Sequence, residues 1–196
     1  MKLLREFYQL CENGRCEDLL TESEKAEVKN GGMYLTGVIQ RADATNGNGR
    51  IYPRKTLERE LKNYQRLIDE NRAIGECDHP DSSVVNLKNA SHVLVKYWWD
   101  GNDVMGKIKV LNTPSGNILK SLINEGVTLG ISSRSLGSVR EENGRTIVED
   151  DLMMICWDIV ADPSTHGAFM TLSESKNIVP SKEQKLYSLL KDILDD

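Results

Sequence analysis

The chain has 196 residues, of which 39% are hydrophobic and 28% are charged, and its net charge is −5. These globular values exclude wholesale disorder, and the negative charge argues against a surface for general nucleic-acid binding. No apolar run approaches the roughly 20 residues that a membrane-spanning helix needs. One compact domain with tails fits this length.

The amino terminus is untypical of a signal peptide, because Arg5 and Glu6 interrupt its apolar stretch and no small-residue cleavage site follows. We expect a cytoplasmic protein with reduced thiols and with neither a metal nor a cofactor. The cysteines are too few and too unevenly spaced for a disulfide scaffold or a zinc site. They are Cys11, Cys16, Cys77 and Cys156.

The amino-terminal part of the chain predicts an appendage to the core. Residues 2–10 carry apolar side chains at helical spacing, and residues 16–32 are polar and end in a glycine pair. This pattern predicts a short amphipathic helix followed by a linker and a turn. The folded core is therefore expected to begin near Met33.

The first elements of the core follow from periodicity and breakers. Residues 33–40 alternate as a strand does, and the glycine-rich residues 45–50 predict a loop. Apolar residues at 3.6 spacing, starting after Pro53, predict a helix over residues 54–70.

The middle of the core reads as a hairpin and a second helix. Residues 92–99 and 104–110 are β-rich runs, and the Asp100-Gly101-Asn102 turn between them predicts a hairpin. Residues 114–124 predict a helix. Its inward residues are expected to be Ile118, Leu119, Leu122 and Ile123.

The carboxy-terminal half adds strands and a last helix. Strands are predicted over residues 127–133 and 152–160, with a hairpin over residues 139–149 between them. A helix with one apolar face is predicted from Ser181 onward, after a polar linker. We expect an α+β, β-rich fold, with a barrel-like antiparallel core and a few flanking helices.

Three histidines could serve as a general base for a serine nucleophile. His79 lies in Gly75-Glu76-Cys77-Asp78-His79-Pro80, whose composition predicts a loop at the end of an element, the usual location of site residues. His92 lies within a strand pattern, where a structural role is more common. His166 is the third. His79 is therefore the preferred base.

A candidate nucleophile lies in Gly130-Ile131-Ser132-Ser133-Arg134-Ser135-Leu136-Gly137-Ser138. A strand that runs into a serine- and glycine-rich bend can present a hydroxyl and leave backbone N–H groups free for an oxyanion. By composition alone such a segment is more often only a turn. Ser132 and Ser133 are both candidates on this evidence.

Asp158 stands alone in the apolar run 152–160. A buried carboxylate must be paired or lose its charge, because an isolated buried charge is very costly. Orienting a histidine is one such pairing, and a structural salt bridge is the other. The residue alone does not decide between them.

Two similar tetrapeptides bracket the expected core. Leu20-Thr21-Glu22-Ser23 is repeated as Leu172-Ser173-Glu174-Ser175, and each copy lies in a polar segment that a protease could reach. Their positions at both boundaries of the core suggest cleavage sites.

These motifs together closely resemble the prohead core protein proteases of large T-even-like tailed phages. The resemblance runs from about residue 33 to residue 169 and covers five motifs in one order. They are Asn48-Gly49-Arg50-Ile51-Tyr52-Pro53, Gly75 to Pro80, Trp98 to Val104, Gly130 to Ser138, and Asp158 to Ser164.

The resemblance implies a serine protease with an assemblin-like fold, distantly related to the herpesvirus assemblins. It implies Ser132 as nucleophile, with Ser133 as its rival, His79 as base and Asp158 as the third member. Backbone groups around Ser133 and Arg134 are expected to support the oxyanion. Ser135 stands where relatives often have glycine and adds a third hydroxyl.

The resemblance also implies cleavage after Leu or Ile, any residue, and Glu, which matches both tetrapeptides. Self-cleavage is therefore expected between Glu22 and Ser23 and between Glu174 and Ser175. The expected parts are an N-terminal propeptide (1–22), a protease domain (23–174) and a C-terminal propeptide (175–196). Arg50 and Arg134 are the candidate partners of the substrate glutamate.

The expected substrates are phage scaffold and capsid proteins, inside a procapsid assembled in the host cytoplasm. Self-association is expected through the terminal helices, with no nucleic-acid or membrane partner. Two alternatives remain open: a non-enzymatic scaffold subunit with a β-barrel fold, and a cysteine peptidase that uses Cys77 or Cys156. The first predicts no self-cleavage, and the second suffers because Cys77 lies only two residues from the base.

Overall fold

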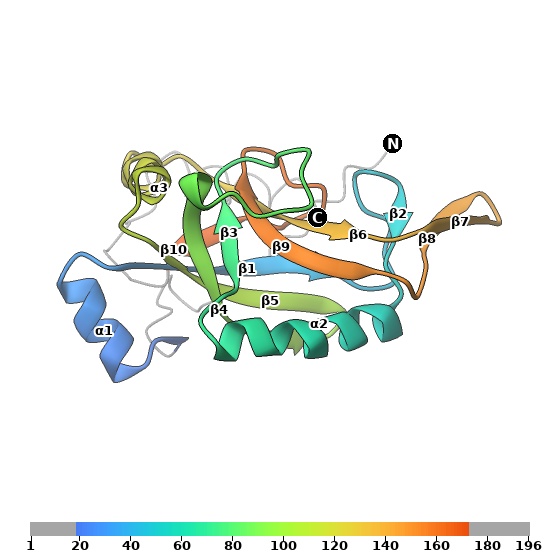
Figure 1. The fold of residues 1–196 in the computed structure, drawn as a ribbon, viewed down its shortest axis with the longest axis horizontal. Helices are drawn as coiled ribbons and strands as arrows, with labels where there is room; N and C mark the ends of the chain where they lie inside the picture. Colours follow the sequence, from blue (N-terminus) through green and yellow to red (C-terminus); the bar gives the residue numbers. More distant parts are fainter. Residues whose placement is uncertain (1–18, 173–196) are drawn as a thin grey trace, which may run out of the picture.

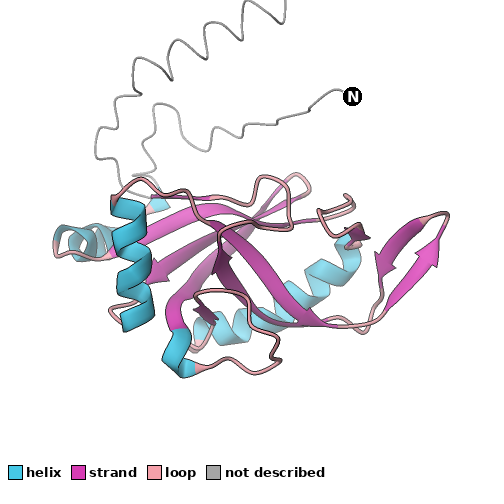
Figure 2. Cartoon of the chain, turned by 90° about the horizontal axis from the view of Figure 1, so that it is seen from above, coloured by secondary structure: helices cyan, strands magenta, loops and turns pink. Residues whose placement is uncertain are grey.

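The computed structural model describes residues 19–172, a β-rich α+β fold with three α-helices in that range (Figures 1 and 2). The expected helices over residues 2–10 and from Ser181 lie outside the described residues. The elements in chain order are α1 (Glu22–Lys29), β1 (Met33–Arg41), β2 (Arg50–Ile51), α2 (Arg54–Asp69), β3 (Ile74–Glu76), a 3-10 turn η3 (Leu87–Asn89), β4 (Ala90–Asp100), β5 (Asp103–Val110), α3 (Pro114–Asn124), β6 (Gly130–Leu136), β7 (Val139–Glu142), β8 (Arg145–Val148), β9 (Met153–Val160) and β10 (Met170–Leu172).

The largest sheet has five strands in the order β10-β1-β5-β4-β3. The predicted hairpin of β4 and β5 is confirmed, and Gly101 takes the left-handed conformation, with φ of 56°, that its tight turn requires. Helix α2, predicted from its 3.6 periodicity, buries Leu57, Leu61 and Tyr64. The Tyr64 ring meets Trp157 of β9 edge to face, with the ring centroids 4.8 Å apart. Helix α2 therefore packs in the same hydrophobic core as the large sheet and β9.

Strands β6 and β9 form a second sheet of their own, paired antiparallel along their whole length. Single bridges link it to the large sheet: Cys77 pairs with Ile159, and Gly130 pairs with Phe169 just before β10. The described strands thus lie in three sheets and do not make one continuous closed barrel. The expected β-rich α+β fold is confirmed, whereas the expected barrel is not found.

A third sheet has the order β2-β8-β7, and its hairpin of β7 and β8 projects beyond the rest of the molecule (Figure 1). The predicted hairpin is confirmed, and Asn143 and Gly144 have φ of 52° and 73°, as its tight turn requires. Every residue of β7 is exposed, and within residues 19–172 β8 is the one strand that pairs with β7. Strand β8 in turn pairs in parallel with β2, through Arg50 and Ile51.

Residues 22–29 form helix α1, so the expectation of a linker over residues 16–32 is wrong there. A capping box starts this helix: the Thr21 hydroxyl accepts from the backbone N–H of Glu24, and the Glu24 carboxylate accepts from the backbone N–H of Thr21. Apolar contact is limited to a small cluster of Leu20, Val28 and Tyr34. This short helix carries few apolar residues, which is why periodicity missed it.

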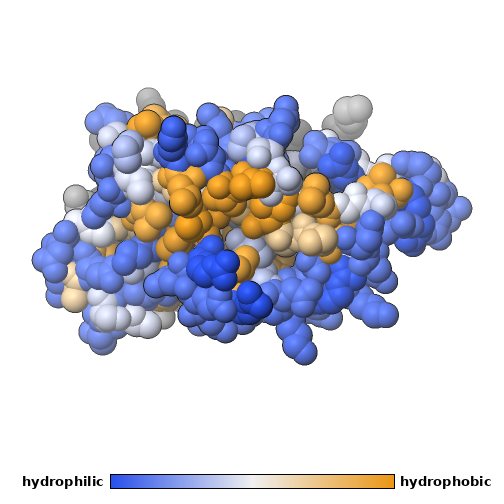
Figure 3. Space-filling view, viewed as in Figure 1, coloured by the Kyte–Doolittle hydropathy of each residue, from blue (hydrophilic) through white to orange (hydrophobic). Residues whose placement is uncertain are grey.

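Helix α3 has the predicted bounds, but its apolar face is only partly used. Leu119 is 1% exposed, whereas Ile118 is 56% and Leu122 is 37% exposed, so the expectation that all four apolar residues face inward is wrong. Figure 3 shows further apolar side chains as a band across the middle of the molecule, bordered by polar residues. No helix among residues 19–172 is long and apolar enough to cross a membrane.

Candidate active site

Strands β6 and β9 bring two of the candidate residues together. Ser132 of β6 pairs directly with Asp158 of β9, so the two side chains share one face of the sheet. Because successive side chains alternate, Arg134 lies on that face as well, and Ser133 lies on the opposite one. Register alone therefore separates the two serines that the sequence left together.

His79 reaches this face from the loop after β3. Its Nδ1 lies 3.0 Å from Oδ2 of Asp158, whose side chain is fully buried, while the side chain of His79 is 43% exposed. The start of the loop is fixed on β9, because the backbone N–H of Asp78 donates to the Ile159 carbonyl at 2.9 Å. Asp78 takes a left-handed conformation, with φ of 67°, which turns the chain toward Asp158.

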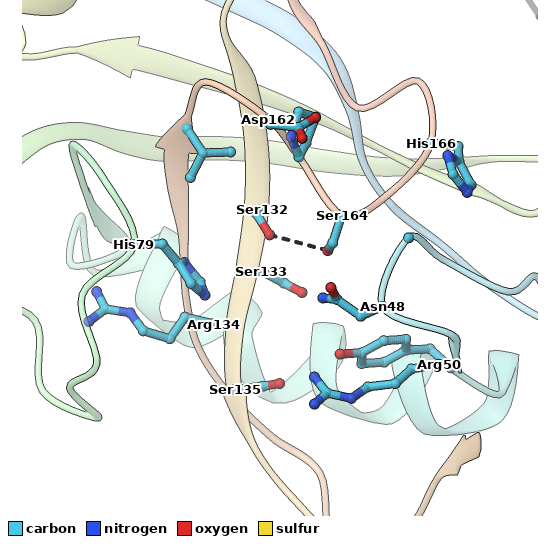
Figure 4. Close-up of a pocket in the computed structure, with 14 residues that line it drawn as sticks. Asn48, Arg50, His79, Ser132, Ser133, Arg134, Ser135, Asp162, Ser164 and His166 are labelled. Atoms are coloured by element: carbon cyan, nitrogen blue, oxygen red, sulfur yellow. Dashed lines mark hydrogen bonds between the residues drawn. The ribbon is translucent and has the colours of Figure 1, made fainter.

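The hydroxyl of Ser132 is close to the loop that follows β9. Its Oγ lies 3.4 Å from Oγ of Ser164, and Ser132 is 8% exposed. Figure 4 shows this contact on one side of Ser132 and the ring of His79 on the other. A hydroxyl can give up such a long contact by rotation about its Cα–Cβ bond.

Ser133 is held by the buried amide of Gln40. The amide nitrogen of Gln40 donates to Ser133 Oγ at 3.0 Å, and the hydroxyl of Thr165 donates to the amide oxygen at 2.8 Å. The backbone N–H of Arg41 also donates to that oxygen, at 3.1 Å. The donors fix the orientation of the amide, which thereby holds the Ser133 hydroxyl on the face of β6 opposite to Ser132.

The side chain of Arg134, a candidate partner of the substrate glutamate, does not point toward the space beside Ser132. It is 6% exposed and turned away from that space (Figure 4). Its Nη2 donates to Glu76 Oε1 at 2.6 Å and to Asp158 Oδ1 at 3.2 Å, and its Nη1 donates to the Ser82 carbonyl at 2.8 Å. Its Nε lies 3.0 Å from Asp158 Oδ2, within ion-pair range but without hydrogen-bond geometry.

Glu76, at the end of β3, is a site residue that the sequence reasoning did not single out. It is fully buried, and its backbone N–H donates to Asp158 Oδ1 at 3.1 Å. Burial alone would raise the pKa of its carboxyl, but hydrogen bonds from Arg134 and the Asn86 backbone outweigh burial and hold the pKa below its ordinary value. The available signal was its position three residues before His79, within the same motif.

Backbone direction identifies the free N–H groups of β6. The N–H of Ile131 points away from β9, since it donates to the Ala168 carbonyl at 2.9 Å. N–H directions alternate along a strand, so the N–H of Ser133 also points to that open edge, while those of Ser132 and Arg134 face β9. Of the two residues expected to support an oxyanion, only Ser133 thus has its N–H on the open edge.

A cavity of about 500 Å³ lies along this edge of β6. Arg50 lines it from the opposite wall, is exposed, and comes from the two-residue strand β2 (Figure 4). Asn48, Tyr52, Ser164 and His166 also line the cavity, and of these the sequence reasoning considered only His166, as one of three possible general bases. They fall within or next to the quoted motifs, so motif context was the signal for them.

His92 and the two described cysteines have structural surroundings. His92 is buried, with Nδ1 2.9 Å from the Ser91 hydroxyl and Nε2 3.0 Å from the Trp157 carbonyl, and burial lowers its pKa to about 4. Burial, and then the nearby Asp158 carboxylate, raise the pKa of the Cys156 thiol to about 12. Burial also raises the pKa of Cys77. Neither thiol has the depressed pKa of a reactive cysteine.

No cluster of metal ligands occurs between residues 19 and 172. The Glu22–Ser23 bond lies in the first turn of α1. Glu174 and Ser175 lie outside the described residues.

Comparisons with known proteins agree on one family. A sequence profile described as "Prohead core protein serine protease" matches residues 12–183. The prohead core protein protease of Enterobacteria phage T4 is 34% identical over 148 residues, covering 73% of this chain and 70% of that relative. The solved structure of the bacteriophage T4 capsid assembly protease is similar with a TM-score of 0.65 and 31% identity, covering 67% of this chain and 84% of that chain.

Proposed function

The chain belongs to the prohead core protein serine protease family, and from that premise we propose that Ser132, His79 and Asp158 carry out peptide hydrolysis. The observation that supports this most is the 3.0 Å contact between His79 Nδ1 and Asp158, on the face of the sheet that Ser132 shares. Ser133 is the weaker candidate, because Gln40 holds its hydroxyl on the other face.

In the proposed reaction, Ser132 Oγ gives up its contact with the Ser164 hydroxyl and attacks the scissile carbonyl carbon. The Oγ–C bond forms while Nε2 of His79 takes the hydroxyl proton, and the imidazolium later gives this proton to the leaving amine. Asp158 keeps the proton of the neutral ring on Nδ1, so that Nε2 is free to act as the base. Water then hydrolyses the acyl-enzyme by the same route.

The backbone N–H of Ser133 is the proposed oxyanion donor from β6. It points to the open edge of the strand, where the cavity lies, whereas the N–H of Arg134 faces β9. Removing one such donor in a serine protease typically costs about 3 kcal/mol of transition-state stabilisation.

Arg50 is the proposed partner of a glutamate side chain in the substrate. It lines the cavity, is exposed, and has a guanidinium suited to a carboxylate. Arg134, the other candidate, is occupied by Glu76 and Asp158 and is buried. We therefore assign the selection of glutamate to Arg50 alone.

Self-processing after glutamate is proposed at Glu22–Ser23 and Glu174–Ser175, which divides the chain into residues 1–22, 23–174 and 175–196. A protease binds its substrate in an extended conformation, so the first turn of α1 has to unwind before the bond after Glu22 can be cut. Phage scaffold and capsid proteins inside the procapsid, in the host cytoplasm, are the further proposed substrates. Self-association of the uncleaved chain is proposed to bring one copy to another.

The test is the intact mass of the purified full chain before and after incubation. The wild-type chain is expected to lose residues 1–22 and 175–196, and Ser132→Ala is expected to remain whole. Ser133→Ala is the matched control, one position away on the opposite face, and is expected to be trimmed still. Trimming of Ser132→Ala would overturn the assignment, and a wild-type chain that is neither trimmed nor labelled at serine would favour a scaffold subunit.

A further inference from the structure

Three charged side chains from three strands form a buried cluster beneath His79. Glu76 and Asp158 are fully buried and Arg134 is 6% exposed. The guanidinium lies between the two carboxylates, 2.6 Å from Glu76 Oε1 and within 3.2 Å of both oxygens of Asp158. Even when such groups are paired, the cost of removing them from water can exceed their attraction, so stability alone does not explain the arrangement.

The same cluster holds the loop that carries His79. Arg134 Nη1 donates to the Ser82 carbonyl at 2.8 Å, and Glu76 Oε1 accepts from the Asn86 backbone N–H at 3.0 Å. These bonds fix the loop on its far side, whereas the Asp78 contact to Ile159 fixes it next to His79. Arg134 therefore positions both the carboxylate and the loop.

The charges within the cluster decide what His79 experiences. Asp158 paired with Arg134 alone would be neutral overall and would stabilise an imidazolium little. Glu76 adds a second negative charge, so two carboxylates and one guanidinium give a net charge of −1. His79 then faces the charge that a lone aspartate would supply, with Asp158 held more firmly.

We propose that Arg134 and Glu76 are a charge-compensating pair of positioning residues: Arg134 fixes Asp158 and the His79 loop, and Glu76 cancels its charge. This inference rests on the proposed roles of Ser132, His79 and Asp158. It predicts that loss of the Glu76 charge and loss of the Arg134 charge shift the pH dependence of the Ser132 reaction in opposite directions. Loss of both charges is predicted to restore it.

The other ionisable groups around His79 stay constant in this comparison. Cys77 and Asp78 precede it in the loop, and Cys156 lies on β9 with its thiol 3.3 Å from Asp158 Oδ1. Arg50, Asp162 and His166 line the cavity that His79 also lines. None of them changes between the variants below, so a difference in pH dependence reports the altered cluster.

The readout is the rate at which a fluorophosphonate probe labels the full-length chain between pH 5 and pH 9. In this step the Ser132 Oγ–P bond forms, the P–F bond breaks, fluoride leaves, and the hydroxyl proton passes to His79. The rate rises with pH as the base becomes available, and the midpoint of that rise is measured. Ser132→Ala is the blank.

Glu76→Gln keeps the size of the side chain and its acceptor for Arg134 while it removes one negative charge. The midpoint is expected to fall by roughly one pH unit, with a plateau rate lower by roughly ten-fold, because the imidazolium loses stabilisation. Arg134→Gln is expected to raise the midpoint by a similar amount. The double variant Glu76→Gln/Arg134→Gln is expected to return to within about 0.3 units of the wild-type midpoint.

If Arg134→Gln fails to fold, the double variant still tests the proposal, because it leaves no second carboxylate buried without a cation. Circular dichroism checks the fold of each variant. An unchanged midpoint in Glu76→Gln, or a double variant displaced further than Glu76→Gln, would overturn the compensation, because a purely structural role lowers rates without this pattern. A wild-type chain that is not labelled would overturn the proposed function, and this inference with it.

Discussion

Two cations are buried among residues 19–172, and their surroundings are very different. Lys107 of β5 is 4% exposed, and its Nζ donates to both oxygens of Glu24, at 2.6 and 2.7 Å, and to one backbone carbonyl. Arg134 has two carboxylates and a loop carbonyl as partners, from β3, β9 and the His79 loop. The first region is the base of α1, and the second is the candidate active site.

The difference between the two regions lies in how each is anchored. Helix α1 has eight residues, too few for independent stability, and Val28 is the one buried residue within it. It depends on the Lys107 pair and on the small cluster around Leu20. The cluster at Arg134 ties three elements of the core together. The proposed cut after Glu22 thus lies in a detachable region, and the proposed chemistry lies in a fixed one.

Asp158→Asn gives the largest expected effect and would break the fixed region. The variant keeps the shape of the side chain but can hold His79 in the wrong tautomer, so the labelling rate of Ser132 is expected to fall by roughly 10⁴-fold. The measurement is the fluorophosphonate labelling rate at pH 8. Asp162→Asn is the control, since Asp162 lines the same cavity but is exposed, and it should stay within about two-fold. Equal rates in the two variants would contradict the role of Asp158.

The pH dependence of stability sharpens the contrast, because His92 supports the site strand through the Trp157 carbonyl. Burial lowers the folded-state pKa of His92 from 6.5 to about 4, so the unfolded chain takes up its proton first as the pH falls. The contribution of neutral His92 to the free energy of unfolding is therefore complete above pH 6.5. It is lost as the pH falls toward 4, a change of about 3 kcal/mol.

The measurement is urea unfolding at pH 7 and pH 4.5 for the wild-type chain and His92→Gln. Between pH 7 and pH 4.5, the free energy of unfolding is expected to fall by about 2 to 3 kcal/mol more in the wild-type chain than in His92→Gln. The carboxylates that also lose stability on acidification are common to both chains and cancel in the difference. An identical loss in the two chains would contradict the assignment to His92.

Lys107→Met tests the detachable region. The variant removes the cation beneath α1, and a loss of about 2 kcal/mol in the free energy of unfolding is expected, because Glu24 can turn to solvent and avoid the full cost of a broken buried pair. Labelling of Ser132 should stay within about two-fold. Lys109→Met is the matched control on the same strand, where the pair with Glu27 is more exposed and is worth about 0.5 kcal/mol. A lost labelling signal in Lys107→Met would show that the two regions are coupled.

Thr21→Ala gives the smallest expected effect. Losing the capping hydroxyl of α1 costs about 1 kcal/mol of helix stability, which makes the unwound first turn about five-fold more populated. Cleavage after Glu22 by an added glutamate-specific protease should accelerate by the same factor, as measured by mass spectrometry. Thr146→Ala on the distant hairpin is the control, and equal acceleration there would contradict a local effect.

Much of the fold was predictable from local pattern. The bounds of α2 and α3 and both hairpins follow from helical periodicity and from turn residues, and the family resemblance is confirmed. The pairing of β6 with β9 and the missing closure of a barrel depend on contacts distant in sequence, which no local pattern encodes.

The candidate site shows the same limit at single residues. The strand was expected to end at Ser133, followed by a bend, but β6 runs on to Leu136. Because the strand continues, alternation sends the side chain of Arg134 to the Asp158 side. Where the strand ends thus decided the direction of this side chain, whereas Ser133 already lay inside the expected strand, on the face opposite to Ser132. The burial of Glu76 depends on tertiary pairing and could not be read from its own segment.

The projecting hairpin has a consequence for solubility. Among the described strands, none pairs with the outer edge of β7, and an unpaired edge is a template on which another chain can add a strand. Three of its four residues, Arg140, Glu141 and Glu142, are charged and exposed, and an added strand would strip part of the water from these charges. At the high local concentration of a crowded enclosure, this edge would keep copies from joining into aggregates through their sheets.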